Sequence, residues 1–93
     1  MRQFATHIES AALSSQRDVI TSSIDQIERK REELVRRRNR TGDPTTRRMY
    51  AWLIKQEDES LRILQRQVYR HNEQARRVGH APIEYRHEPV FLG

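Results

Sequence analysis

The stretch that decides the fold is Arg36-Arg37-Arg38-Asn39-Arg40-Thr41-Gly42-Asp43-Pro44, because it ends one long helical segment and begins another. Glycine can adopt the left-handed conformation that closes a helix, so Gly42 is expected just past the first helix. Asp43 can accept hydrogen bonds from the free N–H groups of the next helix, and Pro44 suits its first position. The stretch therefore predicts a tight turn at residues 41–44 between antiparallel helices.

Apolar residues on both sides of the turn recur in alternating steps of three and four, the spacing of a coiled-coil seam. The first seam comprises Ile20, Ile24, Ile27, Arg31 and Leu34. The second comprises Tyr50, Ile54, Glu57, Leu61, Leu64, Val68, His71, Ala75 and Val78. Folding about the turn pairs Ile20 with Leu64. We therefore expect an all-α fold, a long antiparallel helical hairpin resembling a coiled coil.

The ends of the chain complete this prediction. Residues 3–40 contain neither Gly nor Pro, so a single helix with an N-terminal extension is allowed, although Ser14-Ser15 would also suit a break. Gly79 should end the second helix, and the prolines at 82 and 89 exclude a helix interior beyond it. The expected organisation is a helical hairpin at residues 1–79 and an extended C-terminal tail at residues 80–93.

The positive charge of the chain is concentrated at the turn. Residues 28–48 contain nine basic and four acidic residues, and thus hold the whole formal net charge of +5. Cations near a helix C-terminus can simply complement its dipole, but Arg47 and Arg48 lie near a helix N-terminus, where the dipole disfavours them. Guanidinium groups also bind phosphates and carboxylates. The candidate contacts for an acidic partner or nucleic acid are Arg36, Arg37, Arg38, Arg40, Arg47 and Arg48.

A second set of candidates is apolar. Some of these residues broaden the apolar face of the second helix near the turn, and others lie in the tail. The candidate protein interface comprises Met49, Trp52, Leu53, Tyr85, Val90, Phe91 and Leu92. A small hairpin without cysteine has no disulfide to stabilise it, so a protein partner or a homo-oligomer is expected.

The sequence lacks the usual signs of an enzyme. The acidic run at residues 57–59 has no nucleophile or base beside it, and the four histidines are not at metal-ligand spacing. We expect no catalytic residue, metal, cofactor or small-molecule substrate. No apolar run approaches the ~20 residues of a membrane span, and the N-terminus lacks the apolar block of a secretory signal. A protein that is soluble when made, in the cytoplasm or a virion, is expected.

Two resemblances concern the hairpin alone. Residues 27–34 followed by Gly42-Asp43-Pro44 resemble the first half of the small sporulation aspartyl-phosphate phosphatases, which are also helical hairpins. Their second helix carries a Ser-Gln-x-x-x-Asp signature, whereas this chain has only Gln56-Glu57-Asp58, so no phosphatase activity is implied. Length and the Asp-Pro turn also resemble hairpin proteins of type III secretion systems.

The expected function is that of a non-enzymatic structural or adaptor subunit. It would belong to a larger assembly, such as a phage or viral particle or a secretion-type apparatus, and bind through the hairpin seams and the tail. The alternative is an arginine-rich nucleic-acid-binding protein that uses residues 28–48. Arginines gathered at one end, rather than along a helix face, favour the first expectation.

Overall fold

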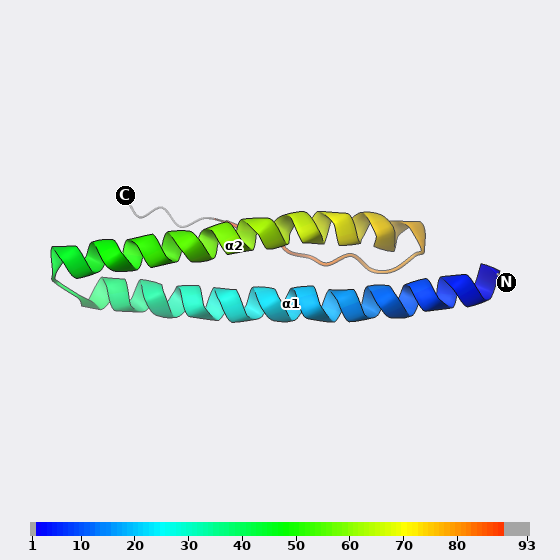
Figure 1. Ribbon diagram of the computed structural model, residues 1–93, viewed down its shortest axis with the longest axis horizontal. Coiled ribbons are helices and arrows are strands. Elements are labelled where there is room, and N and C mark those ends of the chain that lie inside the picture. The colour runs from blue at the N-terminus through cyan, green and yellow to red at the C-terminus, as the bar shows by residue number, and fades with distance from the viewer. Residues whose placement is uncertain (1, 89–93) are drawn as a thin grey trace.

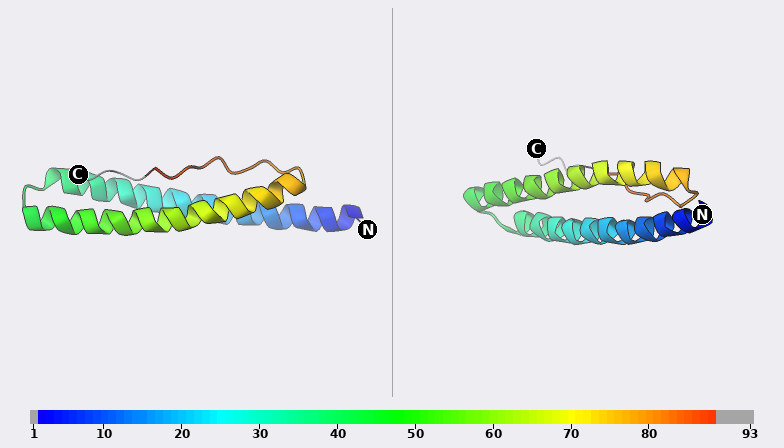
Figure 2. Two further views of the ribbon diagram at one scale, coloured as in Figure 1. Left: turned by 90° about the horizontal axis from the view of Figure 1, so that it is seen from above. Right: turned by 45° about the vertical axis from the view of Figure 1, so that its right-hand side comes forward.

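The computed structural model describes the backbone of residues 2–88 and the side chains of residues 10–88. Helix α1, Arg2–Arg40, and helix α2, Pro44–Arg77, lie antiparallel along their length (Figure 1). At 1.5 Å per residue they are about 58 and 51 Å long. Residues 80–88 form an extended tail that runs back along the hairpin towards the turn (Figure 2). The predicted all-α hairpin with an extended C-terminal tail is confirmed.

Helix α1 is continuous through Ser14-Ser15, which decides between the two alternatives for this region. Neither serine interrupts the backbone hydrogen bonds, and the residues around them include good helix formers. Seam residues further along α1, Ile20, Ile24 and Leu34, are buried. A single long helix can therefore present one apolar stripe to α2 without a bend.

The turn begins α2 as the sequence predicted. Asp43 is the N-cap, and its carboxylate accepts hydrogen bonds from the Thr46 backbone N–H, at 2.9 Å, and from Thr46 Oγ1, at 2.6 Å. Pro44 occupies the first helical position. The hydrogen bonds from Thr46 hold the pKa of the Asp43 carboxyl below its usual value, because they favour the ionised form.

The expectation that Gly42 is left-handed is wrong. Gly79, at φ +73°, is the only described residue with positive φ. Helix α1 instead ends on a normal bond, from the Thr41 N–H to the Arg37 carbonyl at 3.2 Å. The Asp43 N–H then lies 3.3 Å from Thr41 Oγ1, so the chain passes into the extended backbone of the cap. The left-handed glycine that ends a helix is Gly79 instead. It follows α2, and the His80 N–H donates to the Ala75 carbonyl at 2.8 Å.

The two glycines give a matched pair of variants. Gly79→Ala is expected to lower the free energy of unfolding by about 1 kcal/mol, because an L side chain is strained at positive φ. Gly42→Ala should be neutral, or stabilise by about 0.4–1 kcal/mol, since a Cβ there meets no atom within 4 Å. Thermal unfolding of both variants measures the difference. An equal loss of stability in both would contradict this account of the turn.

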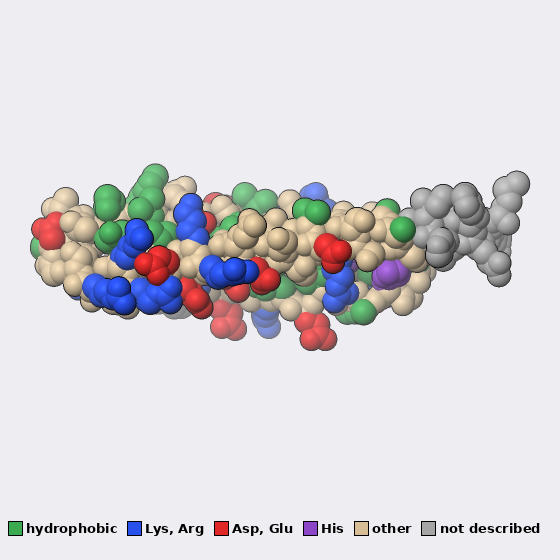
Figure 3. Space-filling model, turned by 90° about the horizontal axis from the view of Figure 1, so that it is seen from below, with side chains coloured by type: hydrophobic (Ala, Val, Ile, Leu, Met, Phe, Trp, Pro, Cys, Tyr) green, Lys and Arg blue, Asp and Glu red, His purple; other side chains and the backbone are tan. Residues whose placement is uncertain are grey.

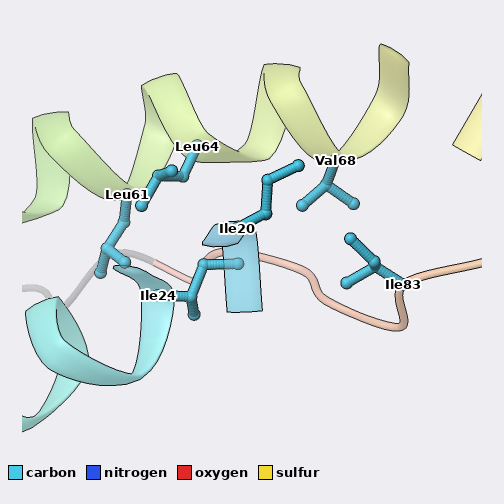
Figure 4. Packing of buried hydrophobic residues seen from close by; sticks show 6 residues of the cluster. All are labelled: Ile20, Ile24, Leu61, Leu64, Val68 and Ile83. Carbon is cyan, nitrogen blue, oxygen red and sulfur yellow. The ribbon is translucent and has the colours of Figure 1, made fainter. Parts of the chain in front are cut away.

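The core lies between the helices and under the tail. Its main cluster contains Ile20, Ile24, Leu61, Leu64, Val68 and Ile83, with Ile27 and Tyr85 packed against it (Figure 4). Ile20 and Leu64 share this cluster, as their predicted pairing requires. Ile83 comes from the tail and points between the helices (Figure 4). The tail is thus a third layer of the core, which the sequence analysis did not predict.

Within the described part of the chain, neither helix is long and apolar enough to cross a membrane. The apolar residues are instead spaced along stripes, with charged residues between them.

Candidate functional site

The seam between α1 and α2 has two sides, and the tail covers one of them (Figure 2). We call the covered side, where residues 81–88 lie against both helices, the tail groove. Two arginines of α1 bind tail carbonyls there: Arg17 Nη1 donates to Ala81 O at 2.7 Å, and Arg31 Nη2 donates to Glu88 O at 3.2 Å. The tail is therefore held near both of its described ends.

Two side-chain amides of α2 hold the tail backbone between these points. The Asn72 amide accepts from the Ile83 N–H at 2.7 Å and donates to the Ile83 carbonyl at 3.1 Å. The Gln65 amide accepts from the His87 N–H at 2.8 Å and donates to the Tyr85 carbonyl at 3.1 Å. Each amide thus pairs with one backbone donor and one acceptor, as a neighbouring β-strand would. We call Gln65 and Asn72 the amide clamps.

The tail also contributes an aromatic side chain. Tyr85 is partly buried against the core, and its hydroxyl lies in the interior. Burial raises the pKa of Tyr85 to about 12, and the negative charge of Glu28 acts in the same direction. Tyr85 was predicted to contact a partner; here it packs on its own hairpin. Val90, Phe91 and Leu92, predicted with it, lie outside the described residues.

A charged cluster lies beneath the end of the tail groove. Arg31 Nε is 2.7 Å from Asp58 Oδ1, and His87 Nε2 of the tail is 3.6 Å from the same oxygen. All three side chains are at least four-fifths buried. Nearby, Lys30 Nζ binds Glu57 Oε1 at 3.0 Å. These pairs explain how Arg31 and Glu57 occupy seam positions, where apolar residues are usual.

His71 is the buried polar member of the second seam. Its Nδ1 lies 2.9 Å from Gln16 Oε1 on α1, so the ring is hydrogen-bonded inside the hairpin. Burial lowers the pKa of His71 from its usual value of 6.5, and the positive charges of Arg17 and His80 lower it further. The folded protein therefore favours neutral His71.

This lowered pKa predicts how stability depends on pH. As pH falls below about 6.5, the unfolded chain binds a proton at His71 before the folded chain does. The free energy of unfolding should be insensitive to His71 above that pH and fall below it, by at most ~1.4 kcal/mol per pH unit, until the folded-state pKa is passed. Urea unfolding at pH 7.5, 6.5 and 5.5 measures this slope. His71→Gln, which keeps an amide for Gln16, should flatten it, and an unchanged slope in that variant would contradict the assignment.

No described residue of the tail covers the other side of the seam (Figure 2). On α2, one row of residues steps by four and three beside the buried seam: Met49, Leu53, Gln56, Ser60, Ile63 and Gln67. No member of this row is charged, and Met49 and Ile63 are about half exposed. Trp52 borders it and is 60% exposed. We call this row, with Trp52 and with Val19 of α1, the open flank.

Val19 continues the open flank across the seam. It is 67% exposed and lines a shallow depression together with Ser15, Gln16, Gln67 and Arg70. Of the five large hydrophobic side chains exposed in the described chain, four therefore belong to the open flank; the fifth is Tyr69. Hydrophobic side chains also gather near the turn along one edge in Figure 3. Two of the predicted interface residues, Met49 and Trp52, are exposed on this flank, and Leu53 is partly buried.

The basic turn end has few acids left for its arginines. Glu33 binds Arg36 and Arg37, at 2.7 and 3.2 Å, which lowers the pKa of its carboxyl. Asp43 is occupied by the cap of α2. Basic side chains gather towards the turn on one edge of the molecule (Figure 3). Arg40, Arg47 and Arg48 are exposed, and within residues 10–88 none of them forms an ion pair.

Arg38 differs from the other arginines at this end. Its side chain is partly buried, and its Nε atom is buried without a hydrogen bond to any described residue. The six arginines predicted as one contact surface thus separate into a pair bound to Glu33, one partly buried residue and three exposed residues. Arg36 and Arg37 are exposed as well, so the last group, Arg40, Arg47 and Arg48, differs from them in forming no ion pair within residues 10–88.

The groove residues that sequence reasoning missed are Gln65 and Asn72. They are two turns apart on α2, on the side of the buried seam away from the open flank. The sequence feature that indicates this packing lies in the tail, where Ile83 and Tyr85 alternate with polar residues and so face one side of an extended chain. Nothing in the residues around positions 65 and 72 marks them as different from other polar positions. Among the described residues, no group of three acidic, His or Cys side chains could hold a metal ion.

Comparisons of this chain with protein-family models, with curated proteins and with solved structures find no match. The described residues form a helical hairpin with one side of its seam covered by its own tail and the other side uncovered.

Proposed function

We propose that this chain is a small, non-enzymatic structural or adaptor subunit that works by binding other protein chains within a larger assembly, such as a phage or viral particle or a secretion-type apparatus. The observation that carries the proposal is the open flank. Within residues 10–88, four of the five exposed large hydrophobic side chains lie along one side of the hairpin, where residues 80–88 of the tail do not reach. An uncharged row of this length on a soluble helix is typical of a surface that another protein covers.

The spacing of the open flank favours a helical partner. Steps of four and three keep residues on one side of a helix, so the row forms a second seam beside the buried one. Helix α2 therefore has an apolar arc wider than one neighbouring helix can cover. The same row on another hairpin would complete a four-helix arrangement, in which both second seams are buried.

The test is self-association of the full-length protein. Wild type should sediment as a dimer or larger species at micromolar concentration, and Trp52→Lys/Ile63→Lys should shift it to monomer, because charges would be buried without partners. Tyr69→Lys is the control, since Tyr69 is as exposed as Trp52 but lies outside the open flank. A cooperative wild-type monomer, or equal effects of the flank and control variants, would contradict the proposal.

Nucleic-acid binding through the turn end is the second candidate function. It is favoured by Arg40, Arg47 and Arg48, which are exposed at an end where Glu33 and Asp43 are already bound to other groups. Binding of this kind weakens steeply with salt, with a log–log slope of about −0.7 to −0.9 per phosphate contact.

Replacing these three arginines with Gln is expected to reduce that slope by about 2–3 and to weaken binding to RNA and duplex DNA alike. The control replaces Arg66, Arg76 and Arg77, which removes the same charge from the rest of α2. Titration of a labelled oligonucleotide at two salt concentrations measures both. Absence of salt-sensitive binding by wild type would leave protein binding as the function of the turn end.

A further inference from the structure

We propose that the tail groove is a peptide-binding site that holds an extended segment by its backbone, and that in an assembly it binds residues 81–88 of a neighbouring copy. The existence of a neighbour rests on the proposed function above; the binding site itself does not. The ligand class is an extended peptide with a branched aliphatic residue followed, two positions later, by an aromatic residue. In this chain these are Ile83 and Tyr85.

The spacing of the amide clamps matches an extended chain. Gln65 and Asn72 are seven residues apart, which on a helix is about 10.5 Å. Asn72 pairs with Ile83, and Gln65 pairs with the stretch from Tyr85 to His87, so the paired positions are centred three residues apart. Three extended residues span about 10 Å. The two amides on the helix are therefore spaced to match backbone groups of an extended peptide. They take the role that the edge of a β-sheet has when a peptide binds by β-augmentation.

Affinity and selectivity come from different contacts in the groove. The clamps and the two arginines bind backbone atoms, so they accept any extended sequence that can supply them. Ile83 supplies selectivity, because its side chain is buried in the cluster with Ile20 and Val68 (Figure 4). Tyr85 adds a second apolar contact on the same side of the extended chain.

The connection between hairpin and tail permits exchange between copies. Gly79 closes α2, and residues 80–82 join it to the first clamped residue, so the tail can leave without unwinding the helix. A short linker gives the chain's own tail a local concentration of the order of millimolar. A neighbour that donates its tail must lie beside the tail groove, on the side opposite the open flank, because residues 80–82 span only about 10 Å when extended. The open flank and the tail groove lie on opposite sides of the seam, so both can be occupied at once.

Two full-length variants test the site by complementation. Gln65→Ala/Asn72→Ala has a damaged groove and an intact tail; Ile83→Asp has an intact groove and a tail that cannot bind. Mixed together, each also carrying Trp52→Lys/Ile63→Lys so that the open flank cannot join them, they should form a one-to-one heterodimer in native mass spectrometry that neither forms alone, since one tail fits the other groove. A labelled peptide of residues 79–88 should bind the Ile83→Asp variant and bind the groove variant at least tenfold more weakly. The same peptide carrying Ile83→Asp is the negative control.

Circular dichroism checks that each variant keeps its helices, and Ile83→Ser replaces Ile83→Asp if it does not. Absence of both heterodimer and peptide binding in helical variants would overturn the proposal. Peptide binding without heterodimer would overturn exchange between copies, because the groove would then accept the tail only as a free segment. Repeating the peptide titration in the Trp52→Lys/Ile63→Lys background separates the two proposals. If the peptide binds this variant but wild type does not self-associate, the groove is supported and the open flank is refuted. If wild type self-associates but the peptide does not bind, the groove is refuted.

Discussion

Leu61→Ala is expected to lower the free energy of unfolding by about 2–5 kcal/mol, the usual cost of removing a buried leucine side chain. Leu61 is fully buried, and it belongs to the cluster that joins both helices and the tail. The cavity would open between α1 and α2 beside Ile24, in the packed seam of the hairpin (Figure 4). Small domains have total stabilities of about 5–15 kcal/mol or less, so this single change should remove much of it.

The matched control for this variant is Ile63→Ala. Ile63 lies two residues away on α2 and is 48% exposed, so the same helix loses a similar side chain from the open flank. The expected cost is below about 1 kcal/mol in the monomer, since little buried surface is lost. Urea unfolding at low protein concentration measures both. Equal costs would show that the two sides of α2 are equally buried and would contradict the hairpin packing described above.

The seams and the start of α2 could be predicted because each depends on local sequence. The steps of three and four identify which side of each helix is buried, and Ile20, Ile24, Ile54, Leu61, Leu64 and Val68 are buried as predicted. Asp43 and Pro44 act through hydrogen bonds and backbone angles within three residues of themselves. Such features are specified by their immediate neighbours, so one sequence is enough to find them.

At Gly42 the local sequence is compatible with two ways of ending helix α1. A helix can end on a left-handed glycine or on a normal hydrogen bond followed by extended backbone. At this turn the Thr41 hydroxyl lies within reach of the Asp43 N–H, so the second solution needs no positive φ. The sequence allows both, and the choice depends on how the three connecting residues span the distance between packed helices.

The tail groove could not be predicted because it depends on residues far apart in the chain. Asn72 binds Ile83, eleven positions away, and Arg17 binds Ala81 across 64 positions. Gln and Asn on a helix surface normally face water, so their pattern carries no sign of a clamp.

The open flank was predicted only in part, because its apolar residues are not continuous in the sequence. The sequence places Met49, Trp52 and Leu53 close together. The polar residues Gln56 and Ser60 then interrupt the row before Ile63, so Ile63 was not assigned to the same surface.

Asp58→Ala is expected to cost about 2–4 kcal/mol, because it leaves Arg31 charged and mostly buried without its partner. Because the two side chains are still 15% and 16% exposed, we expect a smaller cost than for an ion pair that is completely excluded from water. The variant also removes the carboxylate that His87 of the tail faces at 3.6 Å. Glu59→Ala is the control, since it removes an adjacent acid whose partner Arg62 is exposed, and it should cost less than about 1 kcal/mol.

The double variant Arg31→Leu/Asp58→Leu separates the strength of the pair from the cost of breaking it. Arg31 occupies a seam position, so Leu there continues the apolar stripe, and replacing a buried pair with apolar residues is often neutral or stabilising. The double variant should therefore recover most of the stability that Asp58→Ala loses. It should also loosen the tail near Glu88, whose carbonyl accepts from Arg31. Hydrogen exchange of residues 85–88 measures that loosening, and unchanged protection there, together with a stability as low as that of Asp58→Ala, would contradict a role for the pair beneath the tail.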